Sequence, residues 1–252
     1  MAGILSGKTL VVMGVANQRS IAWGCTEALI AQGARVILTY QNDRLKRSLQ
    51  RFVAADQPLI ECDVADDDNV DQAFATIQAE YGPIDGLIHA IAYADKATLT
   101  GNFVNTSRAG YDLAQNISAY SLIAIARAAR PILKAGAGIV TLTYFGSERA
   151  IPNYNVMGVA KAALEANVRY LARDLGPQHI RVNAISAGAV KTLAVTGIQE
   201  HGQLLKMSQN LTVDGVSVTT QEIGNVAAFL LSDLATGMTG DVVYVDKGVH
   251  LS

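Results

Sequence analysis

Tyr154 and Lys161 are the side chains whose types and spacing most directly suggest chemistry. The phenol of Tyr154 can donate a proton, and Lys161 can place a positive charge nearby. If both belong to one helix, a separation of seven residues puts them on the same face, ~10 Å apart along its axis. Lys161 lies between Ala160 and Ala162, and a lysine in such apolar company is unusual. For the pair in isolation, a packing tyrosine and a lysine reaching for solvent remain the alternatives.

The segment from Gly14 to Gly24 could bind a phosphate group. It follows an apolar run, which predicts a strand, a tight turn and the start of a helix. The free N–H groups and the dipole at a helix N-terminus attract phosphate. Ser20 could cap this helix and also donate its hydroxyl to the anion. The spacing differs from the common Gly-x-Gly-x-x-Gly, and an ordinary strand-to-helix loop is the alternative.

Two further polar residues, Gln41 and Asp63, follow the next two apolar runs. Enzymes that bind NAD often place an acid at the first of these points, and those that bind NADP often place an arginine. Gln41 therefore marks the choice of cofactor only weakly. Asp63 could accept a hydrogen bond from an adenine amino group, or it could cap the following helix.

The elements that position these residues are short apolar runs alternating with longer segments of helical periodicity. This order implies right-handed crossovers and a parallel sheet covered by helices on both faces. We therefore expect an α/β fold with one doubly wound domain over 1–252, about seven strands, and a ligand at their carboxyl ends. The expected strands are 9–14, 35–40, 59–62, 84–90, 138–143, 180–185 and 241–245. The expected helices are 20–33, 43–53, 66–81, about 108–130 and 154–175.

Composition excludes several classes of protein. Half of the 252 residues are hydrophobic and 17% are charged, which excludes a disordered chain and suggests surface covered by other subunits. The net charge of -2 argues against a general nucleic-acid or membrane-surface binder. Neither a signal peptide nor a membrane span is expected. Cys25 and Cys62 are expected to be free buried thiols. The four histidines lack the spacing of metal ligands. A cytoplasmic protein without a metal is the expectation.

Several segments together resemble the bacterial enoyl-acyl-carrier-protein reductases, a divergent branch of the short-chain dehydrogenases/reductases. The resemblance covers essentially the whole chain. It includes the loop 14–24, the run Ser-Glu-Arg-Ala-Ile-Pro-Asn-Tyr-Asn-Val-Met-Gly at 147–158, the Tyr-x6-Lys spacing, Ser-Ala-Gly at 186–188 and Thr-Leu-Ala at 192–194. The family often has proline and arginine where this chain has Ala189 and Lys191, so the following segment is expected to be more mobile.

The resemblance implies a Rossmann-type fold, a homotetramer, and NAD(P)H-dependent reduction of enoyl-acyl-carrier-protein thioesters, the last step of the type II fatty acid elongation cycle. NADH is the expected cofactor, with NADPH possible. Tyr144, Tyr154 and Lys161 are the implied catalytic residues. The implied cofactor contacts are Gly14, Ser20, Ile21, Gln41, Asp63, Val64, Ile91, Lys161, Val190, Lys191, Thr192, Leu193 and Ala194. Ala94 is the implied substrate contact. The candidate walls of the substrate pocket are Tyr93, Met157 and Ile198.

The spacing supports this reaction over ketone reduction. Ordinary short-chain dehydrogenases use Tyr-x3-Lys, but Met157 occupies that tyrosine position here. An enoyl thioester accepts hydride at its β-carbon, and negative charge develops on the thioester oxygen two carbons away. A hydroxyl three residues earlier, ~4.5 Å along a helix, fits that displaced oxygen if Tyr154 is helical. Tyr154 then stabilises the enolate, Lys161 supplies the cation and holds the nicotinamide ribose, and Tyr144 shapes the acyl pocket.

A lid over the acyl chain is expected at about 193–210, with an ordinary surface helix as the alternative. Lys191 and Lys206 are candidates for docking the acidic carrier protein. The segment 121–129 is apolar almost all round, which predicts burial on more than one side and favours an oligomer. The rival functions are a carbonyl or alcohol dehydrogenase, a dinucleotide sensor without turnover, and a structural subunit.

Overall fold

The computed structural model describes residues 3–192 and 201–252, and a parallel sheet of seven strands forms its centre. The strand order is β3-β2-β1-β4-β5-β6-β7, so the direction of winding reverses between β1 and β4. The prediction of a doubly wound α/β sheet is confirmed. The strands are β1 (Thr9–Met13), β2 (Arg35–Tyr40), β3 (Leu59–Glu61), β4 (Ile84–His89), β5 (Leu133–Thr143), β6 (Arg181–Ala187) and β7 (Val242–Val245).

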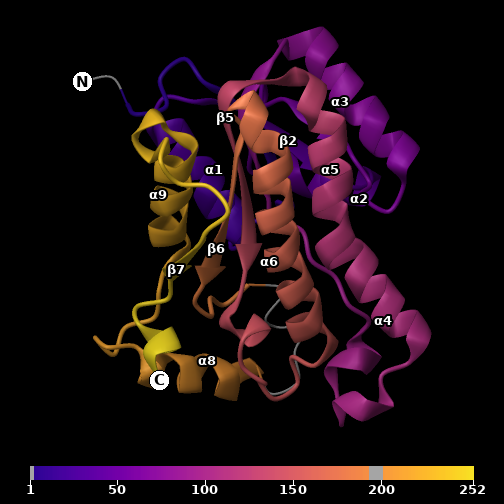
Figure 1. The fold of residues 1–252 in the computed structure, drawn as a ribbon, viewed down its shortest axis with the longest axis vertical. Helices are drawn as coiled ribbons and strands as arrows, with labels where there is room; N and C mark the ends of the chain where they lie inside the picture. The colour runs from indigo at the N-terminus through magenta and orange to yellow at the C-terminus, as the bar shows by residue number, and fades with distance from the viewer. Residues whose placement is uncertain (1–2, 193–200) are drawn as a thin grey trace.

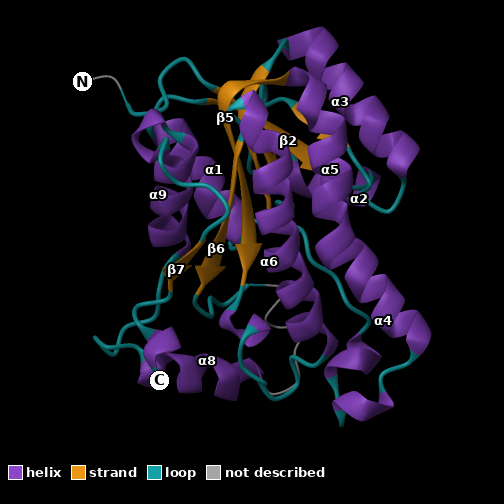
Figure 2. Ribbon diagram, in the orientation of Figure 1, coloured by secondary structure: helices purple, strands orange, loops and turns teal. Residues whose placement is uncertain are grey.

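Helices cover both faces of this sheet, as Figures 1 and 2 show. On one face pack α1 (Ile21–Ala31) and α9 (Thr220–Leu231), and on the other pack α3 (Asp67–Tyr81), α5 (Ser121–Ala129) and α6 (Val156–Leu175). The other α-helices in the described parts of the chain are α2 (Asp43–Leu49), α4 (Arg108–Gln115) and α8 (His201–Leu211). Short 3₁₀ turns are η1 (Lys96–Leu99), η2 (Phe103–Asn105), η4 (Arg130–Ile132), η5 (Phe145–Ser147), η6 (Gly176–Gln178), η7 (Asp233–Ala235) and η8 (Val249–Leu251).

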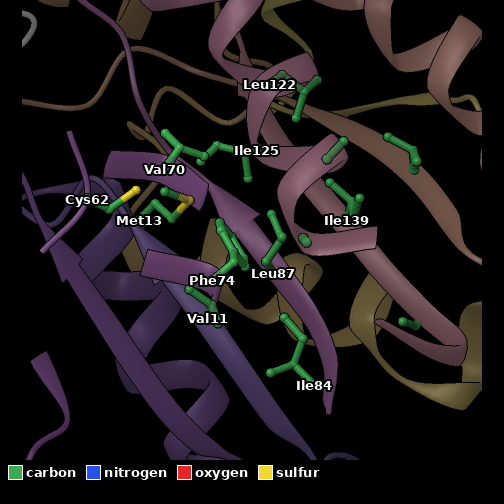
Figure 3. Close-up of a cluster of buried hydrophobic side chains, with 14 of the residues drawn as sticks. Val11, Met13, Cys62, Val70, Phe74, Ile84, Leu87, Leu122, Ile125 and Ile139 are labelled. Atoms are coloured by element: carbon green, nitrogen blue, oxygen red, sulfur yellow. The ribbon is translucent and has the colours of Figure 1, made fainter. Parts of the chain in front are cut away.

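The strands are apolar on both faces because both faces are buried. Val11 and Met13 of β1 enter the core under α3 and α5, shown in Figure 3, whereas Leu10 and Val12 enter the core under α1 and α9. This two-residue alternation is the ordinary geometry of a strand. All four side chains are fully buried, which explains why the strand has a continuous apolar run instead of alternating polar residues.

The long helix expected at 108–130 is interrupted. A π-helical turn, η3 (Asn116–Tyr120), separates α4 from α5. Such turns insert one extra residue and occur often at functional sites. In α5, most side chains are buried against the same chain, so the expected burial on more than one side is confirmed without a second subunit.

Between 211 and 240 no helix is predicted, yet α9 occupies part of that segment. It packs on α1 through two glycines, since a Cβ on Gly224 would lie 2.5 Å from the carbonyl oxygen of Gly24. Gly224 lowers the helix propensity of its own segment. The sequence signal that could have identified α9 is the capping box of Thr219 and Glu222 at its N-terminus. None of the helices within 3–192 and 201–252 combines the length and the hydrophobicity of a membrane-spanning segment.

Candidate active site

The expected site residues at the ends of β1 and β4 lie together. Gly14 follows β1 with φ +90°, and a Cβ there would lie 2.0 Å from the Ala90 carbonyl oxygen and 3.4 Å from the Ile91 nitrogen. Only a glycine allows this approach of two backbones. The contact brings Gly14 and Ile91 together beside the reversal of the strand order.

Ser20 caps α1, as predicted. Its Oγ accepts a hydrogen bond from the Trp23 backbone nitrogen at 3.2 Å, and its hydroxyl donates to the Asn17 carbonyl oxygen at 2.7 Å. The first turn of α1 holds no acidic side chain that would repel an anion. Ile21 starts the helix and is partly buried against the core under α1. This helix start therefore has the free N–H groups and the dipole that suit a phosphate.

Gln41 and Asp63 meet at the ends of β2 and β3. The Gln41 amide nitrogen lies 3.3 Å from both carboxylate oxygens of Asp63. The capping alternative for Asp63 is wrong, because the cap of α3 is Asp66, whose carboxylate accepts from two backbone nitrogens of the first turn. Asp63 instead accepts from the Ala65 nitrogen, and the neighbouring Val64 is buried in the core.

Tyr144 and Tyr154 form an edge-to-face pair beyond the end of β5. Their ring centroids are 5.0 Å apart, with an interplanar angle of 74°. Two glycines shape the loop around them: a Cβ on Gly146 would lie 2.5 Å from Cδ1 of Tyr154, and one on Gly158 would lie 2.6 Å from the Gly146 carbonyl oxygen. The loop therefore packs directly against the first turn of α6, and this packing fixes the Tyr154 ring.

The expectation that Tyr154 is helical is wrong. It lies in a turn at 152–155, and α6 begins at Val156. Asn153 and Asn155 on either side of it have φ of +62° and +39°, conformations that a helix does not contain. The Asn155 amide donates to the Gly101 carbonyl oxygen at 3.1 Å instead of capping the helix. The argument from a shared helix face and from helical rise therefore fails for the Tyr154–Lys161 pair.

Lys161 is buried inside α6, with 6% of its surface exposed. Its ammonium donates to the carbonyl oxygen of Leu142 in β5 at 2.7 Å. Burial lowers the pKa of Lys161 to about 8, and the negative charge of Glu165 partly opposes that shift. The alternative of a lysine reaching for solvent is therefore wrong.

The two tyrosines keep their protons at neutral pH. Burial raises the pKa of Tyr154 well above its usual range, and the charges of Tyr144 and Glu165 raise it further. Burial also raises the pKa of Tyr144, assisted by the charge of Asp246. Both phenols are therefore hydrogen-bond donors rather than phenolates under ordinary conditions.

The substrate-side candidates separate into two groups. Ala94 and Met157 lie in a small apolar cluster with Tyr154, and Met157 is 7% exposed. Its sulfur faces the Ser118 hydroxyl at 3.6 Å, so the residue at the usual tyrosine position packs in the interior. Tyr93 is 56% exposed. The side chains of Ala94 and Met157 therefore line the Tyr154 neighbourhood, whereas Tyr93 lies largely in solvent.

The segment after β6 lies beside α8. A cleft of about 320 Å³ separates them and is lined by Val190, Lys191, Lys206 and neighbouring residues. Thr192 is buried. The candidates Leu193, Ala194 and Ile198, with most of the N-terminal half of the expected lid, lie outside the described residues. The described part of that lid is helical, in α8.

Several polar residues near the site were missed from the sequence. His89, at the end of β4, is fully buried between the hydroxyls of Thr141 and Ser121, and burial lowers its pKa to about 3. Glu165 is buried one turn beyond Lys161. Only the four-residue spacing of Lys161 and Glu165 on one helix could have indicated the second of these from sequence.

The end of β7 also carries a polar network that joins distant segments. The Tyr244 hydroxyl donates to Glu148 of the loop after β5, and the Tyr244 ring stacks on His250 at 4.0 Å. Asp246, 3% exposed, accepts from backbone nitrogens of the C-terminal turn and lies 3.0 Å from His250 Nδ1. The loop of the two tyrosines is thus tied to β7.

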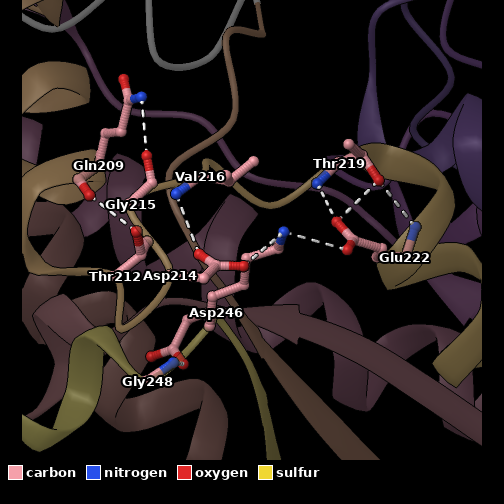
Figure 4. A network of polar contacts seen from close by, with 10 residues as sticks. Gln209, Thr212, Asp214, Gly215, Val216, Thr219, Glu222, Asp246 and Gly248 are labelled. Atoms are coloured by element: carbon pink, nitrogen blue, oxygen red, sulfur yellow. Dashed lines mark hydrogen bonds and ion pairs between the residues drawn. The ribbon is translucent and has the colours of Figure 1, made fainter.

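Lys247, for which the sequence gives no role, links three elements, and its partners Asp214 and Glu222 are labelled in Figure 4. Its ammonium lies 3.2 Å from Asp214 and 3.3 Å from Glu222, and its φ is +54°. Glu222 also takes part in the capping box of α9 with Thr219. The end of β7, the loop after α8 and the start of α9 are therefore held together at one point.

Comparisons with known proteins agree with this geometry. A family model described as enoyl-(acyl carrier protein) reductase matches residues 14–250. The NADH-dependent enoyl-[acyl-carrier-protein] reductase FabI of Enterococcus faecalis is 57% identical over 248 residues, which cover 98% of this chain and 99% of that protein. FabI of Escherichia coli is 46% identical over 253 residues, which cover 99% of this chain and 97% of that protein. The crystal structure of the Bacillus cereus enoyl-acyl carrier protein reductase with NADP+ and indole naphthyridinone superimposes with a TM-score of 0.96 at 48% identity, covering 99% of each chain. The chain therefore belongs to the enoyl-(acyl carrier protein) reductase family.

Proposed function

We propose that this protein reduces the trans-2 double bond of enoyl thioesters carried on acyl carrier protein, with NADH as the reductant. The relatives named above carry this activity in their names. The observation in this chain that carries the proposal is the partly buried Tyr144–Tyr154 pair beyond the end of β5, with the buried cation of Lys161 on the adjoining helix. Met157, packed in the interior, disfavours the rival ketone reductase.

The described residues fit a dinucleotide. The capped start of α1 suits the pyrophosphate, and Gly14 leaves room for the two backbones beside it. Gln41 and Asp63 would bind the adenosine end, where the Asp63 carboxylate would repel the 2′-phosphate of NADPH. The Lys161 ammonium would hold the nicotinamide ribose. When bound, NADH supplies the hydride for the β-carbon.

Tyr154 would donate a hydrogen bond to the thioester oxygen as it becomes an enolate oxygen. Its raised pKa keeps the phenol protonated, and a donor already in place at developing negative charge is a strong form of catalysis. The positive charge of Lys161 would offset the developing negative charge. Tyr144, in edge contact with the Tyr154 ring, would hold that ring in place and close one side of the acyl pocket. Ala94 and Met157 would contact the acyl chain.

The finer features of the assembly are also proposals. The segment 193–210 would act as a lid within a single domain, and Lys191 and Lys206, which line one cleft, would attract the acidic carrier protein. A cytoplasmic homotetramer would cover exposed apolar surface, since several large side chains between 103 and 120 face solvent. These are Phe103, Val104, Tyr111, Leu113 and Tyr120.

A spectrophotometric assay tests the reaction. Absorbance of the reduced nicotinamide is followed with a crotonyl thioester, separately with NADH and NADPH, for the wild type, Tyr154→Phe and Tyr170→Phe. Tyr170 is a matched control because it lies on the same helix and is 73% exposed. We expect NADH oxidation that depends on the enoyl thioester and falls ~10²–10⁴-fold only in Tyr154→Phe.

Two other results would replace the proposal. Oxidation of cofactor with a simple ketone, but not with the enoyl thioester, would indicate a carbonyl reductase. Cofactor binding without turnover of either substrate would indicate a dinucleotide sensor.

A further inference from the structure

Glu165 is a buried carboxylate to which the proposed reaction assigns no role. It lies four residues after Lys161 in α6, on the same face of the helix, and 8% of its surface is exposed. Burying a charged carboxylate is unfavourable unless a partner compensates it. A buried acid at this place therefore indicates that its charge is used.

The hydrogen bonds of Glu165 and Lys161 come from consecutive residues of β5. The Thr143 hydroxyl donates to Glu165 Oε1 at 2.5 Å, and Lys161 Nζ donates to the Leu142 carbonyl oxygen at 2.7 Å. The strand therefore holds both members of the pair at fixed positions along α6. Residues four apart on a helix are neighbours, with their Cβ atoms ~6 Å apart.

Among the described side chains, no basic group lies within 4.0 Å of the Glu165 carboxylate. Glu165 therefore acts on Lys161 through its charge, at a separation beyond that of a closed ion pair. Because no ion pair with a described side chain occupies the Lys161 ammonium, its remaining protons are available to a ligand, while the low polarity of the interior keeps the attraction strong.

We propose that Glu165 is a positioning residue that holds the Lys161 ammonium in its charged form and directs it toward the active site, with Thr143 fixing the carboxylate. The inference rests on the role given to Lys161 in the proposed function. A closed ion pair would largely neutralise the positive charge of Lys161. An acid one turn away instead stabilises the charged form and leaves the ammonium free to interact with a bound ligand.

The pKa of Lys161 lies within the pH range over which the enzyme can be assayed. Burial lowers its pKa to about 8, and Glu165 acts in the opposite direction. The other titratable groups coupled to the two residues or to the tyrosine pair come from β4, the ends of β5 and β7, and the loop before α6. The pKa of His89 is lowered to about 3, and that of Tyr244 is raised to about 12. The pKa values of Tyr144 and Tyr154 are also raised, that of Tyr144 partly by the charge of Asp246.

The test compares Glu165→Gln with Glu27→Gln, an exposed glutamate of α1, and with Glu165→Asp. Glutamine keeps the size of the side chain and can still accept from Thr143, but it carries no charge. The kcat/KM for crotonyl thioester with NADH is measured from pH 6 to pH 10. We expect the alkaline decline to move about one pH unit lower in Glu165→Gln, an activity loss of ~10-fold at pH 9 with ~3-fold or less at pH 6.5. Glu165→Asp, which keeps a charge, should lie between, and Glu27→Gln should follow the wild type.

An NMR titration of lysine side chains labelled at Cε gives a readout independent of turnover, with the Lys161 signal assigned from Lys161→Met. The proposal expects Lys161 to be charged at pH 7 in the wild type and to lose its proton at lower pH in Glu165→Gln. An alkaline decline and a lysine titration identical in wild type and Glu165→Gln would overturn it. If Glu165→Gln does not fold, the wild type and Glu165→Asp are compared instead. A Lys161 that is neutral at pH 7 in the wild type then overturns the proposal. A Lys161 that is charged at pH 7 in the wild type, and that loses its proton at lower pH in Glu165→Asp, supports it. A wild type inactive with enoyl thioesters would count against the proposed function alone, because the lysine titration still tests the pairing.

Discussion

Replacing Gly146 by alanine should disable the site by moving one ring. A Cβ at this position would lie 2.5 Å from Cδ1 and 2.8 Å from Cε1 of Tyr154, and 3.1 Å from Cδ1 of Tyr144. Ordinary contact begins at 3.4 Å, so the Tyr154 ring must retreat by about 0.9 Å. A displacement of ~1 Å at a reacting group lowers the rate by ~10²-fold. We therefore expect kcat for the crotonyl thioester to fall ~10²-fold in Gly146→Ala.

The same clash should also reduce stability, by ~1–3 kcal/mol, as overpacking of an interior usually does. Activity is therefore normalised to folded protein, measured by circular dichroism at the assay temperature. The matched control is Gly237→Ala, since a Cβ there meets nothing within 4 Å and the glycine lies on the surface. Gly146→Ala with kcat within ~3-fold of the control would refute the claim that this contact holds the Tyr154 ring.

Three further outcomes follow from buried and exposed polar groups. Because the pKa of His89 is about 3 in the folded protein and 6.5 for a histidine in water, the unfolded chain binds more protons between these limits. Stability should thus fall by ~1.4 kcal/mol per pH unit as the pH drops below about 6.5, and urea titrations of His89→Gln should show a flatter dependence. At Lys247, with φ +54°, glycine removes the ion pairs but also the strain, so Lys247→Gly should melt about 2–4 °C higher than Lys247→Ala in calorimetry. Thr219→Ala breaks the capping box of α9 and should lower the unfolding free energy by ~1 kcal/mol in denaturant titrations, whereas equal stability would show that the cap is dispensable.

The sheet could be predicted from sequence because its strands are buried on both faces. Continuous apolar runs such as 10–13 and 36–38 are typical of buried parallel strands when helical segments alternate with them. The capped start of α1 could also be predicted, since Ser20 is a local signal. Interactions between segments that are distant in the sequence could not be predicted. The contact of Gly24 with Gly224 is one of these, and it allows α9 to form a close helix pair although glycine disfavours a helix.

In the candidate site, too, residues placed by the sheet topology could be predicted from sequence, whereas residues placed by contacts between distant segments could not. The parallel topology places Gly14, Gln41 and Asp63 at one edge of the sheet, as expected. The position of Tyr154 could not be predicted, because the asparagines on either side of it adopt positive φ, which the sequence pattern does not reveal, and α6 begins only after them. Buried polar groups such as Glu165 are equally hidden, since their partners come from other elements.

Both thiols of the chain are buried, as predicted, and this has a practical consequence for spectroscopy. Burial raises the pKa of Cys25 and of Cys62 to about 12, so neither forms the thiolate that maleimide dyes attack near pH 7. A single surface cysteine, such as Asn210→Cys at the exposed end of α8, can then be labelled without removing the native ones. The native chain is thus already a suitable background for fluorescent or paramagnetic probes that follow α8 in solution.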